Sequence, residues 1–388
     1  MSQCPRILYI SDIPVELSYA GPTLIYRLLE DYPSDRLLVV QGMEINASGR
    51  LPGVTYILQQ SKWLERLKTS RFRNWLTGLL VIQEWLNYLK VKRLAEAYKP
   101  ELIVTVSFRL KWLQGLWLSR RNSIPLHVIL HDDWLLTERY GLWQSFLNRK
   151  FRAMYLRAAG KYCISDAMES HYLALFGVRG QVLFPTRGKS DLLLPCQVRM
   201  GSAAVTRFAY AGTLFTSDFA SLLNRLSRVI GARGFELHLF TNEDRKALSD
   251  YEFLCKSHVN FHGMVGPEEL RQELHDKMDV AILINSFEVE EAFRYNFSSK
   301  LVDYSTAGLP VLIWGPKSSG AISWAVHHGY QGVILHNDDA RMESMVDHLT
   351  DSEFRLSLAN HIQELGRKQF DYETNRRVFY DRITDSDV

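Results

Sequence analysis

Residues 296–316 read NFSSKLVDYSTAGLPVLIWGP and carry the signals of a helix start, a short helix, a glycine stop and a buried strand. Ser298 and Ser299 are favourable N-cap residues because a short hydroxyl accepts from the free N–H groups of a helix's first turn. Residues 300–307 suit about two helical turns. Gly308 then permits the left-handed conformation that ends many helices.

The four residues after Pro310 form an apolar run, VLIW at 311–314, which is typical of a strand buried on both faces. A helix N-terminus above such a sheet concentrates unpaired N–H donors and suits a phosphate. Asp303 lies one turn in, a position from which a carboxylate reaches the hydroxyls of a ribose. The stretch therefore indicates a nucleotide-diphosphate site. The alternative is an ordinary helix start, since many α/β proteins have serines and an early acid there and bind nothing.

Length and composition indicate a globular protein of more than one domain. The chain has 388 residues, of which 46% are apolar and 23% charged, and a domain takes about 100–200 residues. The four cysteines are far apart, form no CxxC pair and follow no signal peptide, which predicts a reducing cytosolic setting without structural zinc. No run approaches the roughly 18 apolar residues of a membrane span, so any membrane contact should be peripheral.

Charge is distributed unevenly along the chain. Residues 1–200 carry 27 Lys and Arg against 16 Asp and Glu, whereas residues 201–388 carry 19 against 27. A basic first half and an acidic second half predict two domains with different partners.

Apolar runs alternate with helical patterns through the first half, the βαβ grammar of a parallel sheet. We predict strands within residues 6–13, 37–42, 101–106, 125–133, 162–168 and 182–186. Ser165 is expected to cap the helix after the fifth of these strands. Gly21, which follows the first strand, permits close approach of a ligand to the backbone or serves as a turn glycine. No GxGxxG motif accompanies it, so a dinucleotide fingerprint is unsupported.

Residues 187–206 lose periodicity and read as a linker, after which the alternation starts afresh. Strands are predicted within 207–214, 235–242, 259–265, 279–285, 311–314 and 332–335, and residues 340–383 look largely helical. We therefore predict an α/β protein of two Rossmann-like domains, 1–190 and 207–370. A C-terminal helix, about 371–388, is expected to pack back on the first domain.

Residues 61–99 carry nine basic and three acidic residues with Trp63, Trp75 and Trp85 at helical spacing. Basic residues interleaved with tryptophans are typical of a helix lying in a bilayer interface, especially one with anionic lipid. In the second interpretation the apolar face packs on the sheet and the basic residues are solvated. Both interpretations stay open at this point.

The strand within 125–133 ends in His131, Asp132 and Asp133. Open α/β sheets bind ligands at the carboxyl ends of their strands, so these side chains lie at the functional edge. Metal ligation is not expected, because no second His and Asp cluster with ligand spacing appears. A structural role for the histidine is the alternative.

Several segments, taken in this order, resemble the GT-B fold and, more closely, glycosyltransferase family 4, the retaining nucleotide-sugar-dependent enzymes. The resemblance covers nearly the whole chain and rests on Gly21, HDDW at 131–134, ISDAM at 164–168, YAGTL at 210–214, VNFHGMV at 259–265 and, most specifically, SSKLVDYSTAGLPVL at 298–312. It implies two domains whose parallel sheets face each other across a cleft. The first would bind the acceptor and the second the donor.

The resemblance also implies residue roles. The backbone before SKL meets the donor diphosphate, Asp303 binds the ribose diol, and Met264 and Val265 contact the base. His131, with Asp132 beside it, approaches the transferring sugar and carries the catalytic role, and no metal or other cofactor is required. The donor-binding residues implied are Gly21, Gly212, Thr213, Met264, Val265, Phe297, Ser298, Ser299, Lys300 and Asp303.

Two departures from the family pattern weaken the expected diphosphate site. The family often has two glutamates eight apart, but Tyr295 stands where the first would be and Asp303 is one methylene shorter than the second. The Arg and Lys that commonly follow the first strand of the second domain are also missing. Arg294 and Lys300 are the nearest substitutes in sequence.

The expected function is transfer of a sugar from a nucleoside-diphosphate donor, with retained configuration, to a glycan or lipid-linked acceptor in cell-surface polysaccharide or glycolipid synthesis. We expect a cytoplasmic protein, peripheral on the inner membrane face, with an anionic membrane surface contacted through 61–99 and no nucleic acid partner. Two alternatives remain, motivated by the departures: a catalytically inactive GT-B binding or scaffold subunit, and a GT-B sugar-nucleotide epimerase.

Overall fold

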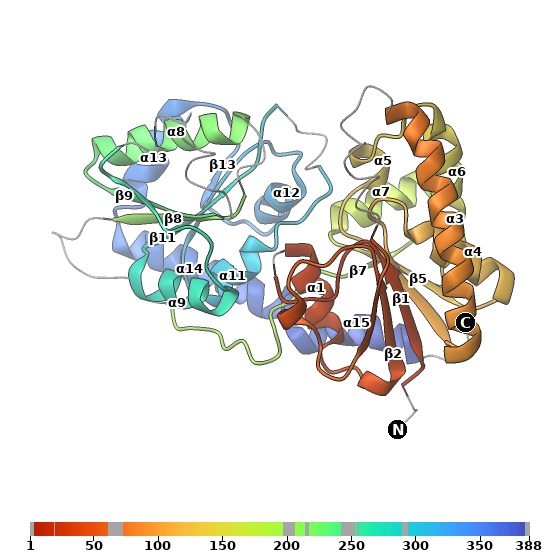
Figure 1. Cartoon of the computed structure of the whole chain (residues 1–388). Helices are drawn as coiled ribbons and strands as arrows, with labels where there is room; N and C mark the ends of the chain where they lie inside the picture. Colours follow the sequence, from red (N-terminus) through yellow and green to blue (C-terminus); the bar gives the residue numbers. More distant parts are fainter. Residues whose placement is uncertain are drawn as a thin grey trace. The chain divides into compact units, whose positions relative to one another are not determined.

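The computed structural model describes residues 4–18, 20–60, 73–196, 206–213, 217–241, 253, 256–288 and 294–384. The described chain divides into two compact units (Figure 1). The first unit comprises residues 1–184 with 373–388, and the second comprises residues 185–372.

The first unit is built on a sheet of seven parallel strands in the order β3-β2-β1-β4-β5-β6-β7. Every residue of β1, β2, β4 and β5 is buried, as the unbroken apolar runs predict for strands covered on both faces. The strands are β1 Ile7–Ser11, β2 Leu37–Gln41, β3 Thr55–Leu58, β4 Leu102–Val106, β5 Leu126–Leu130, β6 Gly160–Cys163 and β7 Gln181–Val182.

Helices cover both faces of this sheet. One face carries α1 and α15, whose apolar residues share a core with β1 and β2, and the other carries α3 and α4 (Figure 1). The helices are α1 Ala20–Leu29, α3 Arg73–Tyr98, α4 Trp112–Asn122, α5 Trp134–Thr137, α6 Gln144–Arg157, α7 Asp166–Phe176 and α15 Tyr372–Thr384, with 3-10 turns η1 Ser34–Arg36, η2 Ala47–Gly49 and η3 Gly141–Trp143.

The C-terminal helix α15 belongs to the first unit although the chain reaches it from the second. Phe379 is fully buried against the strands, and its carbonyl oxygen accepts a hydrogen bond from the Tyr162 hydroxyl at 3.5 Å. The last helix therefore completes the core of the first unit.

The second unit is built on a sheet of six parallel strands in the order β10-β9-β8-β11-β12-β13. Helices α9, α11 and α14 pack together on one face, and α8 packs with α13 on the other (Figure 1). The strands are β8 Arg207–Ala211, β9 Glu236–Phe240, β10 Val259–Phe261, β11 Val280–Ile284, β12 Val311–Trp314 and β13 Val333–Ile334. The helices are α8 Ser217–Ala232, α9 Pro267–Lys277, α11 Lys300–Thr306, α12 Gly320–His327, α13 Asp339–His348 and α14 Ser352–Gln369.

The described part of the stretch expected as a linker, residues 187–196, packs within the second unit. Leu194 N–H donates to the Thr306 carbonyl at 2.9 Å, and Arg271 forms an ion pair with Asp191. A Cβ on Gly308 would lie 2.8 Å from the Leu194 and Pro195 oxygens. This glycine has the predicted left-handed conformation, φ +71°, and the close approach leaves no room for a side chain.

The predicted α/β class with two parallel sheets is confirmed. No helix in the described ranges is long and apolar enough to cross a membrane.

Candidate functional site

Lys300 lies over the carboxyl end of β8, where the Gly212–Thr213 turn follows the strand. Its Nζ donates to the Tyr210 hydroxyl at 3.0 Å and stands 4.2 Å from the centre of that ring. The Tyr210 hydroxyl in turn donates to the Thr213 carbonyl at 2.9 Å. One chain of hydrogen bonds thus joins the lysine of α11 to the turn after the first strand of this sheet.

Gly212 is required for this arrangement. Its φ is +137°, which favours glycine, and a Cβ there would lie 2.4 Å from Lys300 Cε and 2.6 Å from Nζ. The lysine therefore occupies the space that any other residue at position 212 would fill.

The ammonium of Lys300 has no carboxylate partner among the described residues. Its neighbours are the hydroxyl and the aromatic ring of Tyr210, and burial lowers the pKa of Lys300 to about 7. Loss of water without a compensating anion disfavours the charged form. An anionic ligand bound beside it would supply the missing partner and raise this pKa again.

Helix α11 is fixed to the sheet through Tyr304, which is fully buried. Its hydroxyl accepts from the Ala211 N–H at 3.0 Å and donates to the Ile282 carbonyl at 3.1 Å. The aromatic ring between β8 and β11 therefore sets the position of Lys300, one turn earlier on the same helix.

Ser299 occupies the N-cap position, as its residue type favours, but the expected side-chain hydrogen bond of the cap is not formed. The backbone of Ser299 is helical, with φ −61° and ψ −18°, and its side chain makes no cap hydrogen bond. The carbonyls of Ser298 and Ser299 accept from Leu301 and Val302 instead, so the helix begins with a tight turn. With seven residues, α11 has a small dipole, and the positive charge here rests on Lys300.

Asp303 and Phe297, two further residues predicted for the donor site, have different surroundings from each other. Asp303 is partly buried on α11, one turn after Lys300 and on the same side of the helix. Phe297 is 5% exposed and packs edge-on against Trp324 and Phe370, with ring centres 5.3 and 5.6 Å away. The Phe297 side chain is an anchor in the core, which holds the backbone before α11.

Met264 and Val265 follow β10, the edge strand of the second sheet. Met264 is 63% exposed, whereas Val265 lines a groove of about 490 Å³ between strands β9 and β10 and helix α9. The groove is also lined by Phe240, Asn260, His262, Glu269 and Glu273. The structure does not bring either residue into contact with Lys300, because β9 separates β10 from β8 in the sheet.

Arg294 is exposed in the loop before α11, and no described contact joins it to Lys300 or Tyr210. Of the two substitutes expected for the missing basic pair, Lys300 is therefore the one that reaches the turn after β8. Thr216, which stands in place of one of that pair, lies outside the described residues.

In the first unit, His131 and Gly21 come together at the carboxyl edge of the sheet. A Cβ on Gly21, in the first turn of α1, would lie 3.6 Å from His131 Nδ1. That nitrogen is buried and has no hydrogen-bond partner in the described structure. Burial lowers the pKa of His131 to about 4, so the imidazole is neutral at neutral pH.

Of the two acids after His131, Asp133 is structural. It caps α5 by accepting from Leu135 N–H at 3.0 Å, and it also accepts from the Tyr172 hydroxyl at 3.0 Å. His171 Nε2 lies 3.1 Å from its other oxygen. Asp132, which follows His131 directly in the sequence, is partly buried. The described residues contain no group of three or more side chains arranged to hold a metal ion.

Arg109, which sequence patterns did not single out, has a left-handed backbone just beyond the end of β4. Its φ is +50°, and its carbonyl oxygen accepts from the indole N–H groups of both Trp112 and Trp134 at 2.8 Å. Its own N–H donates to Glu138 at 3.2 Å. Such a conformation persists only where the surroundings enforce it, and it often marks functional positions.

Tyr140 lies within electrostatic range of Arg109 and of Asp12, which follows β1. Burial raises the pKa of the Tyr140 hydroxyl, the carboxylates of Glu138 and Asp12 raise it further, and Arg109 acts in the opposite direction. Because β1, β4 and β5 are adjacent in the sheet, Asp12, Arg109 and His131 all lie at the same edge. In the sequence, His131 was singled out by its position after a buried strand. Asp12 and Arg109 also follow buried strands, and that position is the signal that could have found them.

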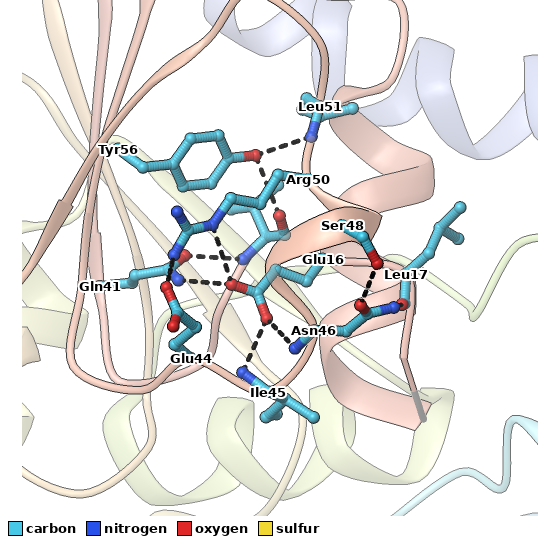
Figure 2. A network of polar contacts seen from close by, with 11 residues as sticks. Glu16, Leu17, Gln41, Glu44, Ile45, Asn46, Ser48, Arg50, Leu51 and Tyr56 are labelled. Atoms are coloured by element: carbon cyan, nitrogen blue, oxygen red, sulfur yellow. Dashed lines mark hydrogen bonds and ion pairs between the residues drawn. The ribbon is translucent and has the colours of Figure 1, made fainter.

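The loop between β1 and α1 is held by Glu16, whose side chain is fully buried (Figure 2). One carboxylate oxygen accepts from the N–H groups of Ile45 and Asn46 at 2.9 and 2.8 Å, and the other accepts from Gln41 at 2.7 Å and Arg50 at 3.3 Å. Burial raises the pKa of Glu16, but these donors outweigh it and the net pKa is lowered. The network fixes the loop that leads to Gly21.

The whole chain has the fold of known GT-B glycosyltransferases. No protein-family model matches it, and no curated protein matches it. Among solved structures, it is similar to the E. coli trehalose-6-phosphate structure bound with UDP-2-fluoro glucose, at 10% identity and a TM-score of 0.66 over 98% of this chain and 99% of that one.

Two further solved structures have the same fold. The lipopolysaccharide outer core galactosyltransferase WaaB, in its apo form, is 12% identical with a TM-score of 0.66 over 97% of this chain and 98% of that one. Sucrose-phosphate synthase from Thermosynechococcus elongatus is 13% identical with a TM-score of 0.64 over the same shares of the two chains. At these identities the likeness establishes the fold alone, so the reaction has to be inferred from the residues of this chain.

Proposed function

We propose that this protein is a retaining, metal-independent glycosyltransferase of the family 4 type. It would move a hexosyl group from a nucleoside-diphosphate sugar to a glycan or lipid-linked acceptor in cell-surface polysaccharide or glycolipid synthesis. The reaction would take place in the cytoplasm at the inner membrane face. Two solved structures with the same fold support a nucleotide-sugar donor, since one holds UDP-2-fluoro glucose and the other is a galactosyltransferase.

The observation that carries the proposal is the uncompensated ammonium of Lys300 above the Gly212–Thr213 turn. A partly buried cation whose neighbours are a hydroxyl and an aromatic ring is unfavourable alone and favourable beside an anion. A donor diphosphate provides that anion, and Asp303, on the same side of α11, would accept from the ribose hydroxyls. Lys300 thereby replaces the basic pair that this chain lacks after β8.

Catalysis would come chiefly from stabilising the leaving group. As the bond from the anomeric carbon to the diphosphate oxygen breaks, its electron pair passes to that oxygen, and Lys300 stabilises the added negative charge. The acceptor hydroxyl forms the new bond to the anomeric carbon and passes its proton to the departing diphosphate oxygen. We assign His131 and Gly21 to the sugar and acceptor; the neutral imidazole would orient hydroxyl groups.

The proposal is tested by nucleotide binding. Calorimetric titration with UDP, GDP, ADP and CDP should detect binding of at least one ligand, and Lys300→Met should weaken that binding about 10- to 100-fold, the value of one or two charge-assisted hydrogen bonds. Lys368→Met is the matched control, because Lys368 is 68% exposed and paired with Glu364 on α14. Failure of every nucleotide to bind would refute the donor site.

The second candidate function is a silent GT-B subunit. Tyr295 in place of the first family glutamate favours it, because a residue of the reaction centre is then missing. Donor binding that His131→Ala leaves unchanged, together with no sugar transfer to any acceptor, would establish this alternative. Conversion of the donor to another sugar nucleotide without an acceptor would instead indicate an epimerase.

A further inference from the structure

Helix α3 is apolar on two opposite faces. Its inner face packs on α4 through Tyr88, Val91 and Ala95, which are at most 5% exposed. Its outer face carries five large apolar side chains that are 43–56% exposed: Leu79, Ile82, Trp85, Leu86 and Leu89. We call these five residues the outer ridge. A surface helix needs one apolar face to join its core, so the ridge is surplus to folding.

The ridge continues onto η3. Leu142 in this turn is 82% exposed, and its neighbour Trp143 packs so closely on α3 that a Cβ on Gly78 would lie 2.9 Å from the indole. Trp85 also packs edge-on against Trp117 of α4, with ring centres 5.3 Å apart. The exposed apolar side chains are therefore backed by a rigid layer of aromatic rings.

Basic residues border the ridge. Lys90 and Arg93 follow it on α3, and both are exposed without an acidic partner among the described residues. Arg120 and Arg121 end α4, and Arg149 and Arg152 lie on the outside of α6. Arg157 links α6 to α4 through the Ser119 carbonyl at 3.2 Å. Glu96 is the exposed acid of the described part of α3, and it is paired with Lys92.

We propose that the outer ridge docks on an anionic lipid surface, with its apolar side chains at the boundary of headgroups and acyl chains. Lys90, Arg93 and the arginines of α4 and α6 would meet the headgroups. An apolar helix face bordered by lysine and arginine is the pattern of in-plane membrane binding. In the described part of this segment, residues 73–98, the helix packs inward and exposes apolar residues outward, whereas residues 61–72, with Trp63, lie outside the described residues.

Charge argues against a second copy of the chain as the occupant. A symmetric contact through the ridge would bring the same basic residues of both copies into one interface. That like-charge contact is unfavourable, whereas anionic lipid neutralises it. The proposal does not depend on the proposed sugar transfer, because vesicle binding is measured without a donor.

Co-sedimentation of the full chain with phosphatidylglycerol–phosphatidylcholine vesicles tests the proposal. We expect binding to these vesicles and much weaker binding to pure phosphatidylcholine. Ile82→Ser with Leu86→Ser should lower the partition coefficient at least about tenfold, because two exposed apolar side chains are lost. Lys90→Gln with Arg93→Gln should lower it about tenfold on anionic vesicles alone.

Leu175→Ser is the matched control, since Leu175 is 47% exposed on α7 of the same unit. Unchanged melting temperatures would show that the variants fold, as their positions at the surface predict. Equal binding to neutral and anionic vesicles, or undiminished binding of the ridge variant, would overturn the proposal. A dimer in sedimentation velocity that the ridge variant dissociates, without vesicle binding, would overturn it in favour of self-association.

Discussion

Replacing Lys300 tests the donor site through its pH dependence. Burial lowers the pKa of Lys300 to about 7, so about half of the free protein carries the ammonium at pH 7. If a diphosphate binds the charged form, its apparent Kd rises as that fraction falls. From the same relation we expect the apparent Kd to rise about fivefold between pH 7 and pH 8, and by a further factor of about ten between pH 8 and pH 9.

The assay is calorimetric titration of the nucleoside diphosphate that binds best, repeated from pH 7 to pH 9. Lys300→Arg keeps its charge throughout this range, so its Kd should stay nearly constant. Lys300→Met should bind 10- to 100-fold more weakly at pH 7 and lose the pH dependence, an effect on the order of one or two charge-assisted hydrogen bonds.

Stability distinguishes a binding role from a structural one. The folded pKa of Lys300 lies below its ordinary 10.5. The unfolded chain therefore binds more protons between about pH 7 and pH 10, and this group opposes folding most at or below pH 7. Lys300→Met should thus leave the melting temperature at pH 7 unchanged or higher. Wild-type affinity that does not vary from pH 7 to pH 9, or a Met variant that binds normally, would refute the reasoning.

Three further predictions concern other residues. Gly212→Ala should displace the Lys300 side chain and weaken nucleotide binding about as much as Lys300→Met, measured by calorimetry; normal binding would show that the close contact relaxes. Glu16→Gln should lose about 2–3 kcal/mol of stability at pH 7 in urea unfolding. An amide has a single acceptor oxygen, so it cannot accept from the two backbone N–H groups and also from the Gln41 and Arg50 side chains. The lowered pKa of Glu16 means that this stabilisation is present above the ordinary pKa of 4.5 and is lost as pH falls, so the variant should show a shallower decline below pH 5. His131→Ala should lower sugar transfer about 10²- to 10³-fold without changing nucleotide affinity, and transfer by the wild type should show no histidine ionisation above pH 5; an equal loss of affinity would place His131 in the donor site instead.

The strands were predictable where burial on both faces leaves an unbroken apolar run. The run at 311–314 became β12, and the left-handed Gly308 before it follows from local backbone rules. Ser165 caps α7 as expected, because its hydroxyl accepts from the Met168 N–H three residues later. β3 was missed since its residues at the sheet edge are partly exposed and lack a continuous apolar signal.

The site was harder to predict because its contacts are distant in sequence. Ser298 and Ser299 satisfy the composition of an N-cap, but Ser299 has a helical backbone at the N-cap position, and no side-chain cap hydrogen bond forms. Lys300 reaches Gly212 only because Tyr304 holds α11 against β8 and β11. No local pattern reports that contact. Likewise, the pairing of His131 with Gly21 depends on the order of strands in the first sheet.

The central claim is sugar transfer from a nucleoside-diphosphate donor, and donor consumption tests it most directly. The full chain is incubated with a panel of uridine, guanosine and adenosine diphosphate sugars, with vesicles and without, and free nucleotide and released sugar are followed by chromatography. The account predicts that one donor is consumed with release of its nucleoside diphosphate, and that Lys300→Met abolishes this while Lys368→Met does not. A donor that binds but is never consumed, or consumption that Lys300→Met leaves unchanged, would contradict it.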